Sequence, residues 1–176
     1  MHCAMAAPPA TPPTLGLELA SPPTDGVTSL RFSGDSGLLL ATSWDAGVRL
    51  YEADPGSQTS ALRQHFVAPG AVLDACFAEA GSTSVVSGGL ARAVTRHDLM
   101  TGTEDVVGTH DAAVKCVEYD EETGMILSGG WDNKLKAWDL RLPAERRCVA
   151  EALLPGKVYS MSLSAAGGAR GRRLVV

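Results

Sequence analysis

This sequence has little of three things that often reveal function: aromatic residues, basic charge and clustered cysteines. Aromatic residues make up 5% of its 176 residues, and the formal net charge is -5. This acidic balance argues against non-specific binding to nucleic acid, which requires a basic surface. The four cysteines, Cys3, Cys76, Cys116 and Cys148, are too far apart for a metal motif. We therefore expect reduced cysteines in an intracellular protein, with no metal site and no cofactor.

Long hydrophobic runs and an N-terminal basic cluster are also missing. No stretch is apolar over the ~20 residues that a membrane-spanning helix needs, so no membrane association is expected. A secretory signal begins with a positively charged segment, but no lysine or arginine precedes Arg31. The N-terminus instead holds six of the ten prolines, within residues 1–23. Its alanine- and proline-rich first part, residues 1–13, is predicted to be disordered.

A repeat is found when residues seven positions apart are compared. The spacing recurs three times, at Trp44 and Tyr51, at Leu90 and His97, and at Trp131 and Trp138. The pairs begin 46 and then 41 residues apart, and a short run that starts with valine precedes each. The runs are rich in valine and leucine, are separated by turn residues and lack helical spacing. Four short antiparallel strands in each period of about 40–45 residues are typical of a propeller blade.

The repeat predicts an all-β chain, an incomplete β-propeller with about three blades and part of a fourth. A strand is also expected before the first blade, because Leu15, Leu17 and Leu19 alternate with other residues. The predicted units are a disordered tail (1–13), that strand (14–20), blade one (24–67), blade two (68–109), blade three (110–154) and a partial blade four (155–176).

Five segments in this order carry a resemblance to a known family. They are "TSWDAGVRLYEA", "GAVLDACF", "SGGLARAVTRHDL", "VGTHDAAVKCVEYDEETGMILSGGWDNKLKAWDLR" and "GKVYSMSLS". Together they resemble the first half of the Bub-three mitotic checkpoint family of WD-repeat propellers, and the Rae RNA-export family is similar but less close. The resemblance runs from about residue 17 to residue 176. It implies seven blades, for which ~300 residues are needed, and therefore a longer gene product. It also implies that the strand at 14–20 closes the ring in the last blade.

The function implied by the resemblance is that of a non-catalytic scaffold of the spindle assembly checkpoint. The family's top face binds GLEBS peptides of checkpoint kinases, and a side surface binds a phosphorylated kinetochore scaffold. The implied location is the nucleus, with kinetochores in mitosis, and the cytoplasm is compatible with it. Trp44 and Trp131 are the expected peptide-binding residues, since exposed indoles are good anchors for a peptide. Gly89 and Leu90 are their counterparts in blade two, although each indole could instead only cover its own turn.

The second Trp-Asp pair belongs to a set of polar residues that WD repeats place inside a blade. In blade three the expected set is His110, Ser128, Asp132 and Trp138, joined by hydrogen bonds from the carboxylate through the imidazole and hydroxyl to the indole. Serine, histidine and aspartate together resemble a catalytic triad, but no GxSxG or other nucleophile motif accompanies them. We therefore interpret the set as framework and expect no enzyme activity.

Two alternative functions stay open at this point. The first is that of an RNA-export factor at the nuclear pore, which would bind a similar peptide together with RNA. The second follows from "LKAWDLR", which resembles the WDxR box of substrate receptors for cullin ubiquitin ligases, with Arg141 as the adaptor contact. Ubiquitin-ligase components would then be partners. Alternatively, Arg141 only faces the loop that follows its strand.

Overall fold

The computed structural model describes residues 18–34, 37–54, 59–79, 83–164 and 174–176. Strands in these ranges form three four-stranded antiparallel sheets, each with its strands in sequential order, and one two-stranded sheet. The predicted all-β fold, with three blades and part of a fourth, is confirmed.

The strand boundaries repeat from blade to blade. Blade one consists of β1 (Val27–Phe32), β2 (Leu38–Ser43), β3 (Gly47–Asp54) and β4 (Thr59–Val67). Blade two consists of β5 (Val72–Ala78), β6 (Ser84–Gly89), β7 (Ala93–Asp98) and β8 (Glu104–Thr109). Blade three consists of β9 (Val114–Asp120), β10 (Met125–Gly130), β11 (Lys134–Asp139), a 3-10 turn η1 (Ala144–Arg146) and β12 (Cys148–Leu153). The partial fourth blade holds β13 (Ser162–Leu163) and β14 (Leu174–Val175).

A tight turn with one left-handed residue joins the second and third strands of each blade. The left-handed residues are Ala46, Arg92 and Asn133, with φ of 66°, 66° and 62°. Because a hairpin turn fixes the register of its two strands, three equivalent turns give three equivalent ladders. The spacing of seven between the paired positions in the sequence therefore measures the same hairpin three times.

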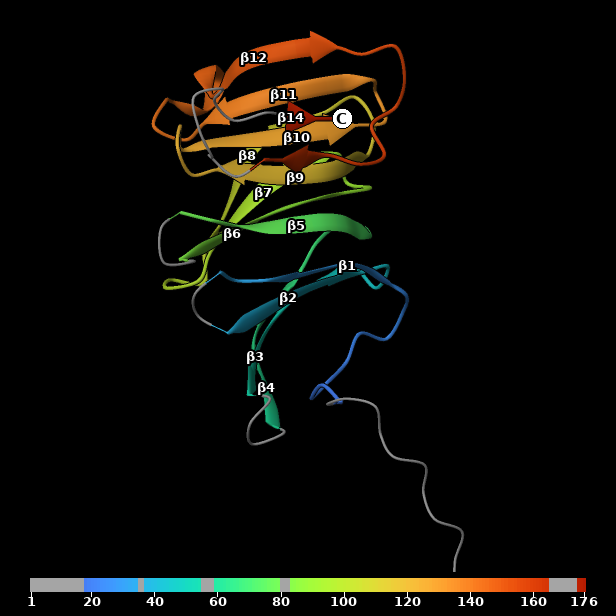
Figure 1. The fold of residues 1–176 in the computed structure, drawn as a ribbon, viewed down its shortest axis with the longest axis vertical. Helices are drawn as coiled ribbons and strands as arrows, with labels where there is room; N and C mark the ends of the chain where they lie inside the picture. The colour runs from blue at the N-terminus through green and yellow to red at the C-terminus, as the bar shows by residue number, and fades with distance from the viewer. Residues whose placement is uncertain (1–17, 35–36, 55–58, 80–82, 165–173) are drawn as a thin grey trace, which may run out of the picture.

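Apolar side chains between neighbouring blades form the core. The largest group of buried residues lies between blades two and three: Cys76, Ala78, Val86, Val94, Val107, Val114, Val117, Ile126 and Trp138. Glycine permits this close approach, since a Cβ on Gly88 would clash with Val114 of the next blade. Figure 1 shows the innermost strands β9, β5 and β1 following one another along the stack of blades. The hydrophobic contacts between sheets thus account for how the blades stack.

Asp74 adds a polar link between all three blades. This buried residue on β5 accepts hydrogen bonds from Ser29 Oγ (2.8 Å) and from the backbone N–H of Val117 (3.1 Å). Arg31 of β1 forms ion pairs with Asp74 (3.3 Å) and with Glu118 of β9 (2.9 Å). A buried carboxylate lowers the stability of the fold unless it is paired. The three inner strands must therefore stay close enough to keep these contacts.

The described segments before blade one and after blade three pack against those two blades. Of the strand predicted at 14–20, positions 14–17 lie outside the described residues, and 18–20 are not in a strand. Leu19 packs on the apolar side of blade one, and Tyr51 donates a hydrogen bond to the Ser21 carbonyl (2.9 Å). At the other end, Val158 and Met161 pack against Cys116 of blade three. The tail at 1–13 also lies outside the described residues.

Candidate functional site

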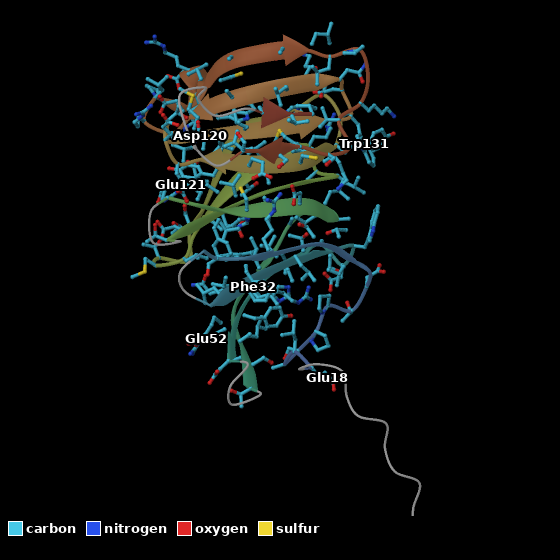
Figure 2. The ribbon with its side chains drawn as sticks, in the orientation of Figure 1. Glu18, Phe32, Glu52, Asp120, Glu121 and Trp131 are labelled. Atoms are coloured by element: carbon cyan, nitrogen blue, oxygen red, sulfur yellow. The ribbon has the colours of Figure 1, made fainter. Side chains whose placement is uncertain are left out.

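Three equivalent turns form one rim of the molecule, and each contributes a large apolar residue. The backbone N–H groups of Trp44, Leu90 and Trp131 donate to carbonyl oxygens that directly precede the inner strands, at 3.0, 2.9 and 2.8 Å. Figure 2 shows Trp131 at the end of the blades opposite to Asp120 and Glu121. Trp44, Leu90 and Trp131 together form a surface, the indole rim.

The exposure of the three rim residues differs. Trp44 is 49% exposed and Leu90 is 41% exposed. Trp131 is only partly exposed, because the Tyr159 ring lies 6.2 Å from the indole between centroids and the Lys157 ammonium lies 5.8 Å from its centre. Its indole nitrogen is buried without a hydrogen-bond partner among the described residues. The sequence predicted two projecting indoles, and only that of Trp44 is half exposed.

Gly89, the fourth predicted site residue, lies below the surface. It is buried at the end of β6, and a Cβ there would clash with the backbone of Ala71. The residue therefore allows the strand end to approach the loop before β5 closely. Gly89 thus places the next residue, Leu90, where its N–H bonds to the Ala71 carbonyl and its side chain lies at the rim.

Hydrogen bonds join the four polar residues of blade three in the expected order. His110 Nδ1 lies 3.0 Å from Asp132 Oδ2, and His110 Nε2 lies 2.8 Å from Ser128 Oγ. The indole N–H of Trp138 donates to Ser128 Oγ at 2.8 Å. Since the carboxylate accepts from Nδ1–H, Nε2 is the acceptor of the serine proton.

The His110 imidazole in this network is uncharged. Burial lowers the pKa of His110, although Asp132 beside it acts in the opposite direction. Burial also opposes ionisation of Asp132, but hydrogen bonds from the Asp111 N–H and from His110 lower its pKa overall. Ser128 is 0% exposed, so its hydroxyl is out of reach of a substrate. The arrangement resembles a catalytic triad in composition and acts as a structural support.

Blades one and two use other polar groups at the same places. In blade two, Ser87 Oγ lies 2.8 Å from Nε2 of His97, which occupies the position of the tryptophan. In blade one, the Asp45 carboxylate pairs with both terminal nitrogens of Arg49, at 2.9 and 2.8 Å. Sequence reasoning missed Arg49, because it looked for a histidine in the loop before the inner strand. The cationic side chains at the equivalent positions 49 and 136 were the available signal.

Arg141 is paired within its own chain. Its Nε and one terminal nitrogen both lie 2.7 Å from the Asp139 carboxylate oxygens, and its side chain is 68% exposed. A bidentate pair of this kind fixes the guanidinium plane. The side chain is largely exposed even when it is paired, so the contact with Asp139 neither blocks nor favours an adaptor protein.

Neither a metal cluster nor a membrane-crossing helix occurs in the described part of the chain. No three histidine, cysteine or acidic side chains there converge on one point in a way that could hold a metal ion. No helix within the described ranges has the length and apolarity needed to cross a membrane. Cys76 and Cys116 are buried free thiols, and burial raises the pKa of Cys116 to about 11. These thiols are packing residues.

Comparison with known proteins identifies the repeat and its relatives. The family model "WD domain, G-beta repeat" matches residues 17–52 and 102–139. The mitotic checkpoint protein BUB3.1 of Arabidopsis thaliana is 45% identical over 93% of this chain and 45% of its own length. The mitotic checkpoint protein bub3 of Dictyostelium discoideum is 35% identical over 84% of the chain and 42% of its own length.

An RNA-export relative is less similar to this chain than the Arabidopsis checkpoint protein is. The Poly(A)+ RNA export protein of Schizosaccharomyces pombe is 37% identical over 82% of the chain and 41% of its own length. The chain thus spans less than half the length of these relatives. With three described blades of the WD type, it is a WD40 protein that covers roughly the N-terminal 40% of the Bub3 homologues.

Proposed function

We propose that this chain is part of a non-catalytic scaffold that binds extended peptides on the indole rim. The observation that carries the proposal is the Trp44 indole, which is 49% exposed in the tight turn between β2 and β3. About half of this indole is open to a partner, and tryptophan is enriched among residues that dominate binding energy. Trp44 is the principal anchor in this proposal, with Leu90 and the partly covered Trp131 beside it.

The proposed role is recruitment of checkpoint kinases to kinetochores in the spindle assembly checkpoint. The peptides would be GLEBS-type segments of those kinases, and a phosphorylated kinetochore scaffold would be a second partner, in the nucleus and on mitotic chromosomes. Support comes from relatives whose names carry the checkpoint role, at 45% and 35% identity. The proposal concerns the rim of the described blades, because the chain spans less than half of those relatives.

Titration of the chain against a fluorescently labelled GLEBS peptide, followed by anisotropy, tests the site. Trp44→Ala should weaken binding about 30-fold, since a hot-spot residue contributes ~2 kcal/mol or more. Phe32→Ala is the matched control, because Phe32 is 70% exposed and lies at the far end of β1 from the rim. Binding of the Trp44→Ala variant within twofold of the unmodified chain would show that the rim is not the binding surface.

RNA export is the second candidate function, and the 37% identity to the export protein supports it. The net charge of -5 gives no sign of the basic face that RNA binding needs. Imaging of the tagged gene product in dividing cells separates the two roles. Enrichment at prometaphase kinetochores is expected, whereas confinement to the nuclear envelope would favour export.

A further inference from the structure

Blade two contains a cavity on the side that faces blade one. Its volume is about 270 Å3, several times the ~30 Å3 that one water molecule takes up in the liquid. Small or apolar residues form most of its wall, and three polar residues also line it: Ser87, Thr95 and Glu104. The cavity reaches the surface at Ala91 and Glu104, which are both exposed.

In blade three, the equivalent space is filled by side chains of the blade itself. Backbone hydrogen bonds place Ala68 and His110 at matching positions, since each N–H donates to the left-handed residue of a turn at 2.9 Å. Gly130 lies against His110 and Asp132, and a Cβ there would clash with both. Its counterpart Gly89 lines the cavity, because alanines at 68 and 91 replace the histidine and the aspartate.

In blade one, an arginine fills the space. Arg49 is 6% exposed, and its guanidinium lies so close to Gly47 that a Cβ there would clash with it. Both terminal nitrogens pair with the Asp45 carboxylate. The blade-two residues that match Gly47 and Arg49 are Ala93 and Thr95, and both line the cavity. The position thus accepts a guanidinium in one blade, and the short threonine leaves it open in the next.

The chemistry of the wall suits a long basic side chain. Ala68, Ala93 and Val106 offer an apolar surface for methylene groups, and long basic side chains place their stems on such surfaces while the charged head remains polar. The Glu104 side chain is 46% exposed, and Oε1 lies 3.4 Å from His97 Nδ1. Burial lowers the pKa of His97, so the imidazole is neutral at pH 7. Within the described ranges, no lysine or arginine pairs with Glu104.

We propose that the blade-two cavity binds the side chain of an arginine from a partner polypeptide, with its guanidinium on Glu104. The partner's arginine would enter the space that Arg49 fills in blade one, but its carboxylate would come from β8, because Ala91 stands where Asp45 does. Arginine fits better than lysine because its planar guanidinium pairs with a carboxylate through two parallel hydrogen bonds. The inference extends the proposed peptide-binding function and rests on it only for the nature of the partner. The cavity would then make the rim selective for a peptide with a basic residue next to the position that contacts Leu90.

N-acetyl-arginine methylamide, added to the isotopically labelled full chain, tests the pocket by NMR. Saturable shifts are expected at the amides of Gly89, Ala91 and Ala93. N-acetyl-citrulline methylamide has nearly the same shape without the charge and should bind about fivefold more weakly, as the loss of a partly exposed ion pair predicts. Glu104→Gln should weaken the arginine probe by a similar factor. Glu151→Gln is the matched control, because Glu151 is 43% exposed and lies in blade three.

The outcomes separate this proposal from its alternatives. Equal binding of the arginine and citrulline probes would overturn the ionic contact and leave an apolar pocket. Absence of saturable shifts in the unmodified chain would show that the cavity binds no such side chain. The probe comparison needs no variant, so it decides the question even if Glu104→Gln fails to fold. Since the probe is not a checkpoint peptide, a failure here is distinct from a failure of the Trp44 test.

Discussion

Replacing Ser128 by alanine should destabilise the chain more than the same replacement at Ser87. The two serines occupy equivalent places in blades three and two, and they are 0% and 3% exposed. They differ in the number of buried groups that depend on them. Ser128 Oγ accepts from the Trp138 indole and donates to the His110 imidazole, each at 2.8 Å. Ser87 Oγ contacts a single ring nitrogen of His97.

The magnitude follows from the polar groups left without partners. A buried donor or acceptor that loses its hydrogen bond costs about 1–3 kcal/mol. Ser128→Ala leaves two such groups, the indole N–H of Trp138 and Nε2 of His110, so we expect a loss of ~3 kcal/mol. Ser87→Ala leaves one, so we expect a loss of ~1.5 kcal/mol. Because both changes remove the same oxygen from a buried site, the cavity term is similar and cancels in the comparison.

Urea denaturation followed by far-UV circular dichroism gives both free energies of unfolding. The informative quantity is the difference in the free energy of unfolding between the two variants. When the m-values agree, the extrapolation to water adds little error to this difference. If the two variants lose stability equally, within about 0.5 kcal/mol, the coupling of the indole and the imidazole through Ser128 contributes nothing, and the reasoning from unpaired groups is refuted.

Three further changes test other parts of the structure by the same denaturation assay. Trp138→Ala should cost about 3–5 kcal/mol because the ring is 4% exposed between blades, and a loss below 1 kcal/mol would contradict its place in the core. Asp74→Asn should cost about 1–3 kcal/mol, since it removes the charge that Arg31 pairs with on β5, and an unchanged midpoint would argue against the link between blades. Burial lowers the pKa of His97 and His110 below 6.5. Below that pH the unfolded chain therefore binds protons that the folded chain does not, and stability should fall as the pH decreases from 7. His97→Gln should make this fall shallower, and an unchanged slope would contradict the assignment.

The repeat explains why so much of blade three could be predicted from the sequence. A spacing of seven between Trp131 and Trp138 measures one hairpin, which joins β10 (Met125–Gly130) to β11 (Lys134–Asp139), and four short strands lie in this period as predicted. Local geometry sets these boundaries, because the turn residues and the alternation of side chains lie in the same short stretch.

Features that depend on contacts between repeats could not be found in the same way. The partial burial of Trp131 arises from Tyr159 and Lys157, which lie in the next repeat. The repeat spacing in the sequence does not predict which side chain covers an indole. The cavity in blade two follows from three small residues, Ala68, Ala91 and Thr95. Ala91 and Thr95 lie close together in one hairpin, but Ala68 lies before β5, and only a backbone hydrogen bond shows that it matches His110.

The three blades meet one structural requirement with three different polar sets, and this separates stability from binding. A buried serine is satisfied by histidine and tryptophan in blade three and by histidine alone in blade two. Blade one has Ala41 at that position, and Tyr51, which takes the place of the tryptophan, donates to the Ser21 carbonyl. The interior therefore reports the fold and does not distinguish one function from another. The Trp44 indole differs, because 49% of its surface is exposed and can contact a partner. Trp44→Ala should consequently weaken peptide binding and cost less stability than Trp138→Ala, because the Trp138 ring is 4% exposed and the Trp44 ring is 49% exposed. If both substitutions lowered stability equally, the rim would be part of the framework, and the argument for a binding surface would lose its basis.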